Sequence, residues 1–334
     1  MKKKVISVLL AGALALSFAG CSSNEAKEEA TPETAAADEN KGTDEDKAAS
    51  DDKAADETSA VDGGVIGFSV STQNNPFFVT LAEGVTSKAS ELGMEVVVVD
   101  AGDDTAKQTS DIEDLISRNV KVLIVNPVDS DAVSPVVQDA VDAGIAVISV
   151  DRAVNGVDIA CQIASDNTAG GRLAGDYMAA QLGEKAKVAE LEGIPGASST
   201  IERGAGFHEA ADAKLDVVAK QTANFNRAEG LDVTENVLQG NGDITGIFAH
   251  NDEMALGAVE AADASQKELC IVGFDATDDA ITAIKEGRMA ATVAQKPELM
   301  GQQAAETAHK ILQNEQIESV IPVEVELITK DNAQ

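Results

Sequence analysis

Short runs of Val, Ile, Leu and Ala alternate with longer helical patterns from residue 63 to the end of the chain. Such nearly continuous apolar runs are typical of strands that are buried on both faces of a parallel sheet. Because helical segments separate most of them, the pattern predicts an α/β protein with helices covering both sides of its sheets. A total of about ten strands favours two sheets over one. The expected strands are 65–70, 95–100, 121–126, 146–151, 157–165, 186–190, 217–220, 246–249, 269–275 and 290–295, with a last one near 323–328.

Glycines mark the ends of several expected helices. Gly93, Gly144, Gly183 and Gly287 stand where a helical pattern stops, and glycine readily adopts the backbone conformation that closes a helix. The expected helices are 78–92, 105–118, 131–143, 168–183, 200–213, 228–238, 252–264, 278–286 and 297–313.

Residues 1–20 are predicted to be a targeting signal. Lys2–Lys4 precede an apolar run over 5–18, which is too short to be a comfortable membrane span. The run ends in Phe18-Ala19-Gly20-Cys21, which resembles a bacterial lipobox, and in a lipobox the Cys becomes the lipidated first residue of the mature protein. Phe18 departs from that pattern, where Leu is usual. An ordinary secretory signal or a short anchor helix is the alternative.

The segment 22–62, which follows Cys21, consists mostly of Ala, Glu, Asp, Lys, Thr and Ser, and Val61 is its only large apolar residue. Such a composition buries too little apolar surface to fold, so 21–62 is predicted to be the lipidated Cys and a disordered acidic tether. A specific interaction tail is the alternative. The chain carries a net charge of −33, so neither nucleic acid nor an anionic lipid surface is an expected partner of the folded body.

The cysteines and histidines of the body show no metal-binding pattern. Cys161 and Cys270 lie singly in apolar runs, with no CxxC and no Cys/His spacing for zinc, so we expect buried free thiols and assign no metal. The sequence has no P-loop, no GxSxG and no dinucleotide glycine fingerprint after its first expected strand. We therefore expect no cofactor and no enzymatic activity. Asp151 and Asp275 as a paired acid and base are the enzymatic alternative, but Arg152 is expected to keep Asp151 ionised.

Polar side chains follow the carboxyl ends of several expected strands. In open α/β sheets, small ligands bind in the crevice at these strand ends. The first strand is followed by Ser71-Thr72-Gln73-Asn74-Asn75-Pro76-Phe77-Phe78. Each Asn or Asp at such a position can instead be a helix N-cap. Taken together, we expect the strand-end residues to converge on one crevice: Asn75, Asn126, Asp151, Arg152, Asn251, Asp275 and Gln295.

These residue types suit the binding of a sugar. The amide of Asn or Gln both donates and accepts hydrogen bonds, Asp accepts two, and Arg donates in a rigid fork. Aromatic rings cover the apolar face of a sugar ring and exclude water, which strengthens those hydrogen bonds. Phe77, Phe78, Phe225 and Phe274 lie beside the polar candidates, and packing in the core is the alternative for them.

In their order and spacing, the motifs from about 63 to 330 resemble those of the bacterial ribose-binding proteins. These are sugar receptors of ABC importers that share the fold of the ligand-binding core of LacI-type repressors. Besides residues 71–78, the motifs are Asn126-Pro-Val-Asp-Ser-Asp-Ala132, Val150-Asp-Arg152, Ile163-Ala-Ser-Asp-Asn167, Glu202-Arg-Gly204, Ala249-His-Asn-Asp-Glu-Met-Ala255, Val272-Gly-Phe-Asp275 and Ala294-Gln295.

The resemblance implies a set of ligand-binding residues. Around Phe225 the sequence departs from the family pattern, because Asn224 and Asn226 flank the ring where Asp is expected. Ser71 is implied as a near neighbour of the ligand. The implied hydrogen-bonding residues are Asn75, Asn126, Asp151, Arg152, Arg203, Asn251, Asp275 and Gln295, and the implied aromatic residues are Phe77, Phe78, Phe225 and Phe274.

The resemblance also implies the type I periplasmic binding protein fold, with two Rossmann-like lobes joined by a three-strand hinge. The expected lobes are 63–165 plus 296–324, and 166–295 plus 325–334. A monosaccharide, D-ribose above all, is expected to bind between them, close the hinge and pass to the permease and ATPase subunits of an importer. Allose, galactose or a furanose signal molecule is the alternative ligand. A sensory or chemotaxis receptor is the alternative function.

The implied location is extracytoplasmic, with a monomeric receptor anchored by lipid to the outer face of the cell membrane. A DNA-binding repressor of the same fold is disfavoured. In this chain a signal and an acidic tether occupy the N-terminus, where a basic helix-turn-helix would be required.

Overall fold

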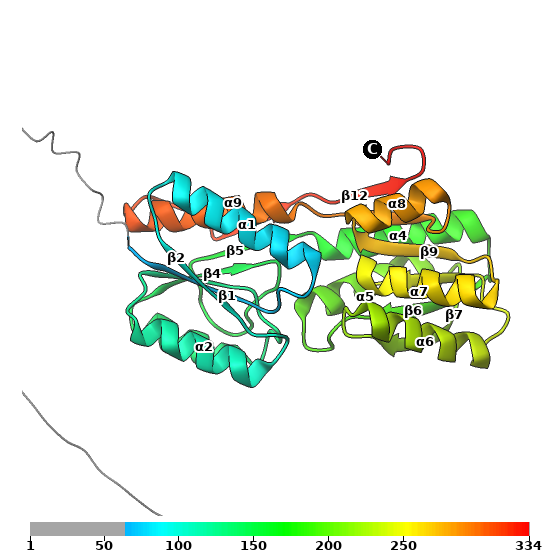
Figure 1. The fold of residues 1–334 in the computed structure, drawn as a ribbon, viewed down its shortest axis with the longest axis horizontal. Helices are drawn as coiled ribbons and strands as arrows, with labels where there is room; N and C mark the ends of the chain where they lie inside the picture. The colour runs from blue at the N-terminus through cyan, green and yellow to red at the C-terminus, as the bar shows by residue number, and fades with distance from the viewer. Residues whose placement is uncertain (1–63, 334) are drawn as a thin grey trace, which may run out of the picture. The chain divides into compact units, whose positions relative to one another are not determined.

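The computed structural model describes residues 64–333, all of which belong to one compact unit (Figure 1). The expected signal at 1–20, Cys21 and the expected tether lie outside the described residues. Within 64–333, no helix has the length and apolarity that a membrane crossing requires.

The strands of the described residues form two six-stranded sheets, as the strand count favoured. The first sheet runs in the order β2 (Val96–Asp100), β1 (Ile66–Val70), β3 (Val122–Val125), β4 (Ala146–Val150), β5 (Cys161–Ser165) and β11 (Val320–Val323). The second runs in the order β7 (Asp216–Thr222), β6 (Lys187–Glu192), β8 (Gly246–Ala249), β9 (Cys270–Asp275), β10 (Ala291–Ala294) and β12 (Glu326–Thr329).

The end of the chain differs from the prediction. The single strand expected near 323–328 is two short strands, β11 in the first sheet and β12 in the second, separated by Glu324 and Val325. In addition, β12 runs antiparallel to β10, whereas all the other strand pairs of the two sheets are parallel. The expectation of wholly parallel sheets was therefore wrong at this edge. The chain reaches β12 directly from the other sheet, with no helical crossover that would return it in the parallel sense.

Helices cover both faces of each sheet, which explains the continuous burial of strands such as β1 and β8. On the first sheet, α1 and α9 pack on one face and α2 and α3 on the other. On the second, α4 and α5 pack on one face and α6, α7 and α8 on the other. The helices are α1 (Pro76–Glu91), α2 (Thr105–Ser117), α3 (Ser134–Asp142), α4 (Asn167–Leu182), α5 (Ser198–Ala211), α6 (Arg227–Gly240), α7 (Asp252–Ser265), α8 (Asp278–Glu286) and α9 (Pro297–Leu312).

Glycine lets the helices α4 and α5 approach each other closely. A Cβ atom added to Gly171 on α4 would overlap the carbonyl oxygen of Arg203 on α5. A Cβ atom added to Gly206 on α5 would likewise overlap the carbonyl oxygen of Thr168. Backbone is therefore in direct contact with backbone along this pair, and the position of Arg203 depends on it. In the first lobe α1 and α9 also pack side by side (Figure 1).

Candidate ligand-binding site

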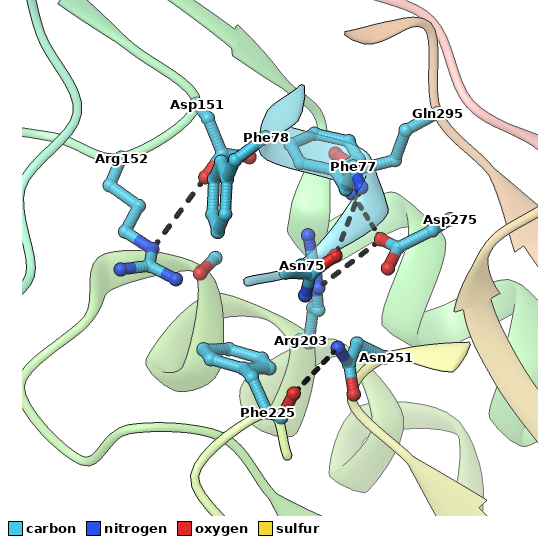
Figure 2. A pocket seen from close by; sticks show the side chains of 11 residues that line it. Asn75, Phe77, Phe78, Asp151, Arg152, Arg203, Phe225, Asn251, Asp275 and Gln295 are labelled. Atoms are coloured by element: carbon cyan, nitrogen blue, oxygen red, sulfur yellow. Dashed lines mark hydrogen bonds and ion pairs between the residues drawn. The ribbon is translucent and has the colours of Figure 1, made fainter. Parts of the chain in front are cut away.

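A pocket lies where the carboxyl ends of strands from both sheets meet. The empty space among its lining side chains, part of it open to solvent, is ≈ 230 Å³, and Figure 2 shows these side chains. Every predicted ligand-binding residue except Ser71, Asn126 and Phe274 lines this pocket. The lining residues are Asn75, Phe77, Phe78, Asp151, Arg152, Ser199, Arg203, Phe225, Asn251, Asp275 and Gln295.

Asp151 and Arg152 follow β4 and are almost completely buried. Arg152 Nε lies 3.6 Å from Asp151 Oδ2, and Arg152 Nη1 donates a hydrogen bond of 2.8 Å to the carbonyl of Pro127. The guanidinium carbon is 5.1 Å from the centre of the Phe78 ring and 5.2 Å from that of Phe225. A cation held between two aromatic rings keeps its orientation without solvent.

Burial governs the ionisation of this pair. Desolvation raises the pKa of Asp151 above its ordinary value, and the charges of Arg152 and Arg203 only partly offset it. Burial likewise lowers the pKa of Arg152. Arg152 and Arg203 thus favour the ionised form of Asp151, as expected of Arg152, while the cost of removing a carboxylate from water opposes it.

Three buried polar atoms around the pocket have no hydrogen-bond partner among the described residues: Asp151 Oδ1, Arg152 Nε and Gln295 Oε1. A buried polar atom left unpaired costs about 1–3 kcal/mol. The backbone beside them is also unusual, because Asp151 and Phe225 have φ angles of 65° and 59°. Unpaired atoms and left-handed backbone at non-glycine residues are typical of sites whose ligand compensates for them.

Arg203 projects from α5 on the side of the second lobe. Its Nε donates to Asn167 Oδ1 at 2.9 Å and its Nη1 donates to the carbonyl of His250 at 2.6 Å. The ring of Phe274 lies behind the guanidinium, 3.9 Å from its carbon. Because Nε and Nη1 are held in this way, Nη2 is the nitrogen that is available to a ligand.

Asp275 and Gln295 form the part of the pocket wall at the ends of β9 and β10. Gln295 Nε2 donates to Asp275 Oδ1 at 2.7 Å. Burial raises the pKa of Asp275 well above its ordinary value; the Arg203 charge opposes this, and buried Asp252 adds to it. Burial raises the pKa of Asp252 itself to about 7, although Thr292 and Thr277 donate hydrogen bonds to it.

The helix-cap alternative holds for two of the strand-end residues. The Asn75 side chain accepts a hydrogen bond from the Phe77 N–H at 3.0 Å, at the start of α1. The Asn251 side chain accepts from the Met254 N–H at 3.0 Å, at the start of α7. Both residues also line the pocket, so the two roles are compatible. Each cap fixes its side chain at the mouth of a helix N-terminus, where backbone N–H groups favour electronegative ligand atoms.

The remaining predicted residues stand behind the pocket wall. Asn126 Nδ2 donates to Asp151 Oδ2 at 3.2 Å, and its Oδ1 accepts from the Ser71 N–H at 3.2 Å. Phe274 is fully buried beneath Arg203. These three residues thus contact residues of the site without lining the pocket themselves. Conversely, Ser199 was not predicted, although Ser198-Ser199-Thr200 after β6 is the same kind of strand-end signal.

The described residues hold no group of His, Cys, Asp and Glu side chains arranged for a metal ion. Cys161 is buried and Cys270 is partly buried, and both are free thiols. Burial raises the pKa of each to about 11, so neither is a reactive thiolate near neutral pH.

Known proteins match this chain over most of its length. Residues 66–316 match the family described as the periplasmic binding protein domain. The ribose import binding protein of Bacillus subtilis (strain 168) is 51% identical over 265 residues, which cover 79% of this chain and 87% of that protein. The ribose import binding protein of Haemophilus influenzae is 51% identical over 266 residues, covering 79% of this chain and 91% of that protein.

A solved structure agrees with these relatives. The crystal structure of the Caulobacter myo-inositol binding protein, bound to myo-inositol, superimposes with a TM-score of 0.78 at 35% identity, covering 81% of this chain and 95% of that one. The predicted fold of two α/β lobes and the resemblance to sugar-binding proteins are confirmed by these likenesses. The chain therefore belongs to the periplasmic binding protein family, with its type I fold and extracytoplasmic location.

Proposed function

We propose that this chain is a receptor that binds D-ribose between its two lobes and delivers it to the permease and ATPase subunits of an ABC importer. The relatives that share half of its residues carry names for ribose import, and they are binding proteins rather than enzymes. The observation that carries the proposal is the set of unpaired buried atoms on Asp151, Arg152 and Gln295. Two of these atoms are acceptors, on Asp151 and Gln295, and one is a donor, on Arg152. This mixture suits the hydroxyl groups of a sugar, which both donate and accept hydrogen bonds.

The aromatic walls of the pocket suit a monosaccharide. Phe77, Phe78 and Phe225 line it and offer apolar faces to a sugar ring. Asp151 and Gln295 would accept hydrogen bonds from hydroxyl groups, while Arg152 and Arg203 would donate to ring or hydroxyl oxygens.

We also propose that the lobes comprise 63–165 plus 296–324 and 166–295 plus 325–334, joined at three crossings. The limits of the strands support this division, because β5 ends at Ser165, β10 ends at Ala294, and Glu324 and Val325 separate β11 from β12. A sugar that contacts both lobes binds the closed arrangement more tightly, and so shifts the hinge equilibrium towards it. The permease would then recognise the closed lobes.

Titration calorimetry of the purified body tests the ligand. We expect saturable heat with D-ribose at one sugar per chain, and weaker or no heat with allose, galactose and myo-inositol, because the pocket is small and its polar atoms are fixed. Light scattering on the same sample should give the mass of a single chain. No heat with ribose, together with saturation by another of these sugars, would replace the proposed ligand.

The lipid anchor is proposed from Cys21 and the apolar run before it. In cells of a lipoprotein-processing bacterium, we expect the full chain to partition with the membrane and to label with a fatty-acid probe. The Cys21→Ala variant should do neither, because the acylated side chain is removed. Equal membrane association of both forms would favour the short anchor helix, and release of both would favour an ordinary secretory signal.

A further inference from the structure

A chain of ionisable side chains leads from the protein surface to the pocket. Glu190 on β6 is completely buried. Its Oε1 lies 2.9 Å from His250 Nε2 and its Oε2 lies 2.9 Å from His208 Nε2. His208 is partly exposed, and its Nδ1 lies 2.7 Å from Asp212 Oδ1. One buried carboxylate thus holds two histidines, one of which reaches solvent.

Both histidines are connected to Arg203. The carbonyl of His250 accepts the 2.6 Å hydrogen bond from Arg203 Nη1. His208 and Arg203 lie on the same helix, α5, with Gly204 next to Arg203. A Cβ atom at Gly204 would lie 3.2 Å from Glu190 Oε1, so the helix backbone rests directly on this carboxylate. Glu190 therefore anchors α5 through His208 and the end of β8 through His250.

The protons in this network can be assigned from the charges. Burial raises the pKa of Glu190, but the hydrogen bond from His250 and the nearby charges, among them those of His208 and Lys220, outweigh it, so the pKa lies below its ordinary value. An ionised carboxylate only accepts hydrogen bonds. His250 must then carry its proton on Nε2. Burial lowers the pKa of His250, so that ring is neutral near pH 7.

His208 is the histidine of this network whose pKa lies above its ordinary value. Burial lowers its pKa, but the hydrogen bond and charge of Asp212 and those of Glu190 outweigh burial and raise it. Below that raised pKa the imidazolium donates to both carboxylates. As the pH rises through it, the ring loses a proton and can donate to only one of them. The contact of His208 on α5 with Glu190 on β6 and with Asp212 therefore has both of its hydrogen bonds at the lower pH and only one of them at the higher pH.

One further charged group, Lys220, contacts the Glu190 carboxylate. Lys220 on β7 lies 3.8 Å from Glu190 Oε2 and 3.0 Å from Glu192 Oε1. The charged groups that connect α4 to α5 form their own pairs and make no hydrogen bond to His208: Arg172 with Glu209, and Asp176 with Lys214.

We infer that Glu190 is a positioning residue for ligand binding. Through His250 and His208 it sets the place of α5 and of the Arg203 guanidinium, and ligand affinity consequently depends on whether His208 carries a proton. The inference rests on the proposed binding of a sugar in this pocket. Neither Glu190 nor either histidine lines the pocket, whereas Arg203 on α5 and Asn251, next to His250, do, so Glu190 and the histidines act through the elements that carry these residues.

The test is the pH profile of ribose affinity, measured by calorimetry between about pH 6 and pH 9. For the wild type we expect affinity to fall by about tenfold as His208 loses its proton, the range expected for one charge-assisted hydrogen bond. His208→Gln keeps a donor for Glu190 but does not titrate, so its profile should lack this fall. Glu190→Gln should bind about tenfold more weakly at the lower pH and should also lack it.

Two controls make the result specific. Asp275 in the pocket wall and buried Asp252 are present in every variant, so the difference between the wild type and His208→Gln isolates the contribution of His208. Lys214→Gln removes a surface pair with Asp176 on the same lobe and should keep the wild-type profile. Identical profiles for wild type, His208→Gln and Glu190→Gln would overturn the inference.

A second readout separates this inference from the proposed function. If the wild type binds no pentose at any pH, the proposed ligand is wrong, while the NMR resonance of Arg203 Nε–H still reports on its position. We expect that resonance to shift with pH in the wild type and to stay constant in His208→Gln. A resonance that does not respond to pH in the wild type would overturn the positioning role.

Discussion

Replacing Asp151 with Ala is expected to lower the affinity for ribose by about a hundredfold or more, corresponding to about 3 kcal/mol. The substitution removes Oδ1, the unpaired acceptor at the pocket, and also Oδ2, which lies 3.6 Å from Arg152 Nε. Arg152 then remains buried between Phe78 and Phe225 without its adjacent carboxylate. Isothermal titration of ribose into the variant measures the loss.

Two matched variants show why Asp151→Ala loses affinity for ribose. Asp151→Asn keeps the size and one acceptor but removes the charge, so its loss should lie between those of wild type and Asp151→Ala. Asp243→Asn also removes one carboxylate, but on the surface of the second lobe, where Asp243 pairs with Lys187 at 2.7 Å; it should bind ribose normally. Near-normal binding by Asp151→Ala would mean that the sugar binds elsewhere.

The same substitution should also lower the stability of the ligand-free protein. An uncompensated buried charge costs about 3–5 kcal/mol when its partner is removed, and the Pro127 carbonyl is left as the hydrogen-bond partner of Arg152. Thermal unfolding without sugar separates this effect from ligand binding. In Asp151→Asn an amide oxygen remains beside the Arg152 guanidinium, so a smaller loss of stability is expected.

The fold could be predicted because the strands and the helices that cover them each follow from the pattern of apolar residues over a few neighbouring positions. Continuous apolar runs such as Val122–Val125 can be buried only between two layers of helices. The separation of β11 from β12 could not be predicted in the same way. Apolar residues stand on both sides of Glu324, Val320–Val323 before it and Val325, Leu327 and Ile328 after it, so the sequence reads as one continuous strand. Only the strands that pair with each half, which belong to two different sheets, show that the chain leaves one sheet and enters the other.

The part of the site that lies at the carboxyl ends of the strands could be predicted, because small ligands bind at these ends in open α/β sheets. We call this the strand-end rule. That rule brings Asn75, Asp151 and Gln295 to one pocket from positions far apart in the sequence. It does not tell which side of the backbone a side chain occupies, and so it does not separate Asp275, which lines the pocket, from the preceding Phe274, which does not. Nor does it reveal a contact such as that of Glu190 with His250, which arises only when neighbouring strands are in register.

The two lobes touch at a point where only glycine fits. Gly196 lies between β6 and α5, and its carbonyl accepts a hydrogen bond of 2.9 Å from the Ser130 N–H of the other lobe. The Ser198 N–H donates to Ser130 Oγ at 3.1 Å.

A Cβ atom at Gly196 would overlap the carboxylate of Asp129. That carboxylate is not free to move aside, because it accepts hydrogen bonds from the N–H groups of Asp131 and Ala132 at 2.9 and 2.8 Å.

Gly196→Val is therefore expected to hold the lobes apart. Overpacking a close contact costs about 1–3 kcal/mol, and here the cost falls on the closed arrangement alone, because the contact exists only when the lobes meet. Ribose affinity should fall by about tenfold to a hundredfold. Small-angle X-ray scattering should show less compaction on adding ribose than in the wild type, while thermal stability without sugar should change little.

Removing the obstructing carboxylate should restore closure. In the double variant Gly196→Val/Asp129→Gly, we expect affinity and compaction to recover most of the way towards wild type, because the space of the Asp129 side chain accommodates the valine. Asp129→Gly alone controls for the loss of its hydrogen bonds to the start of α3. If the double variant is as weak as Gly196→Val, the defect lies in the β6–α5 loop itself. In that case closure against Asp129 is not what the ligand requires, because a purely steric obstacle has to disappear when either of the two overlapping groups is removed.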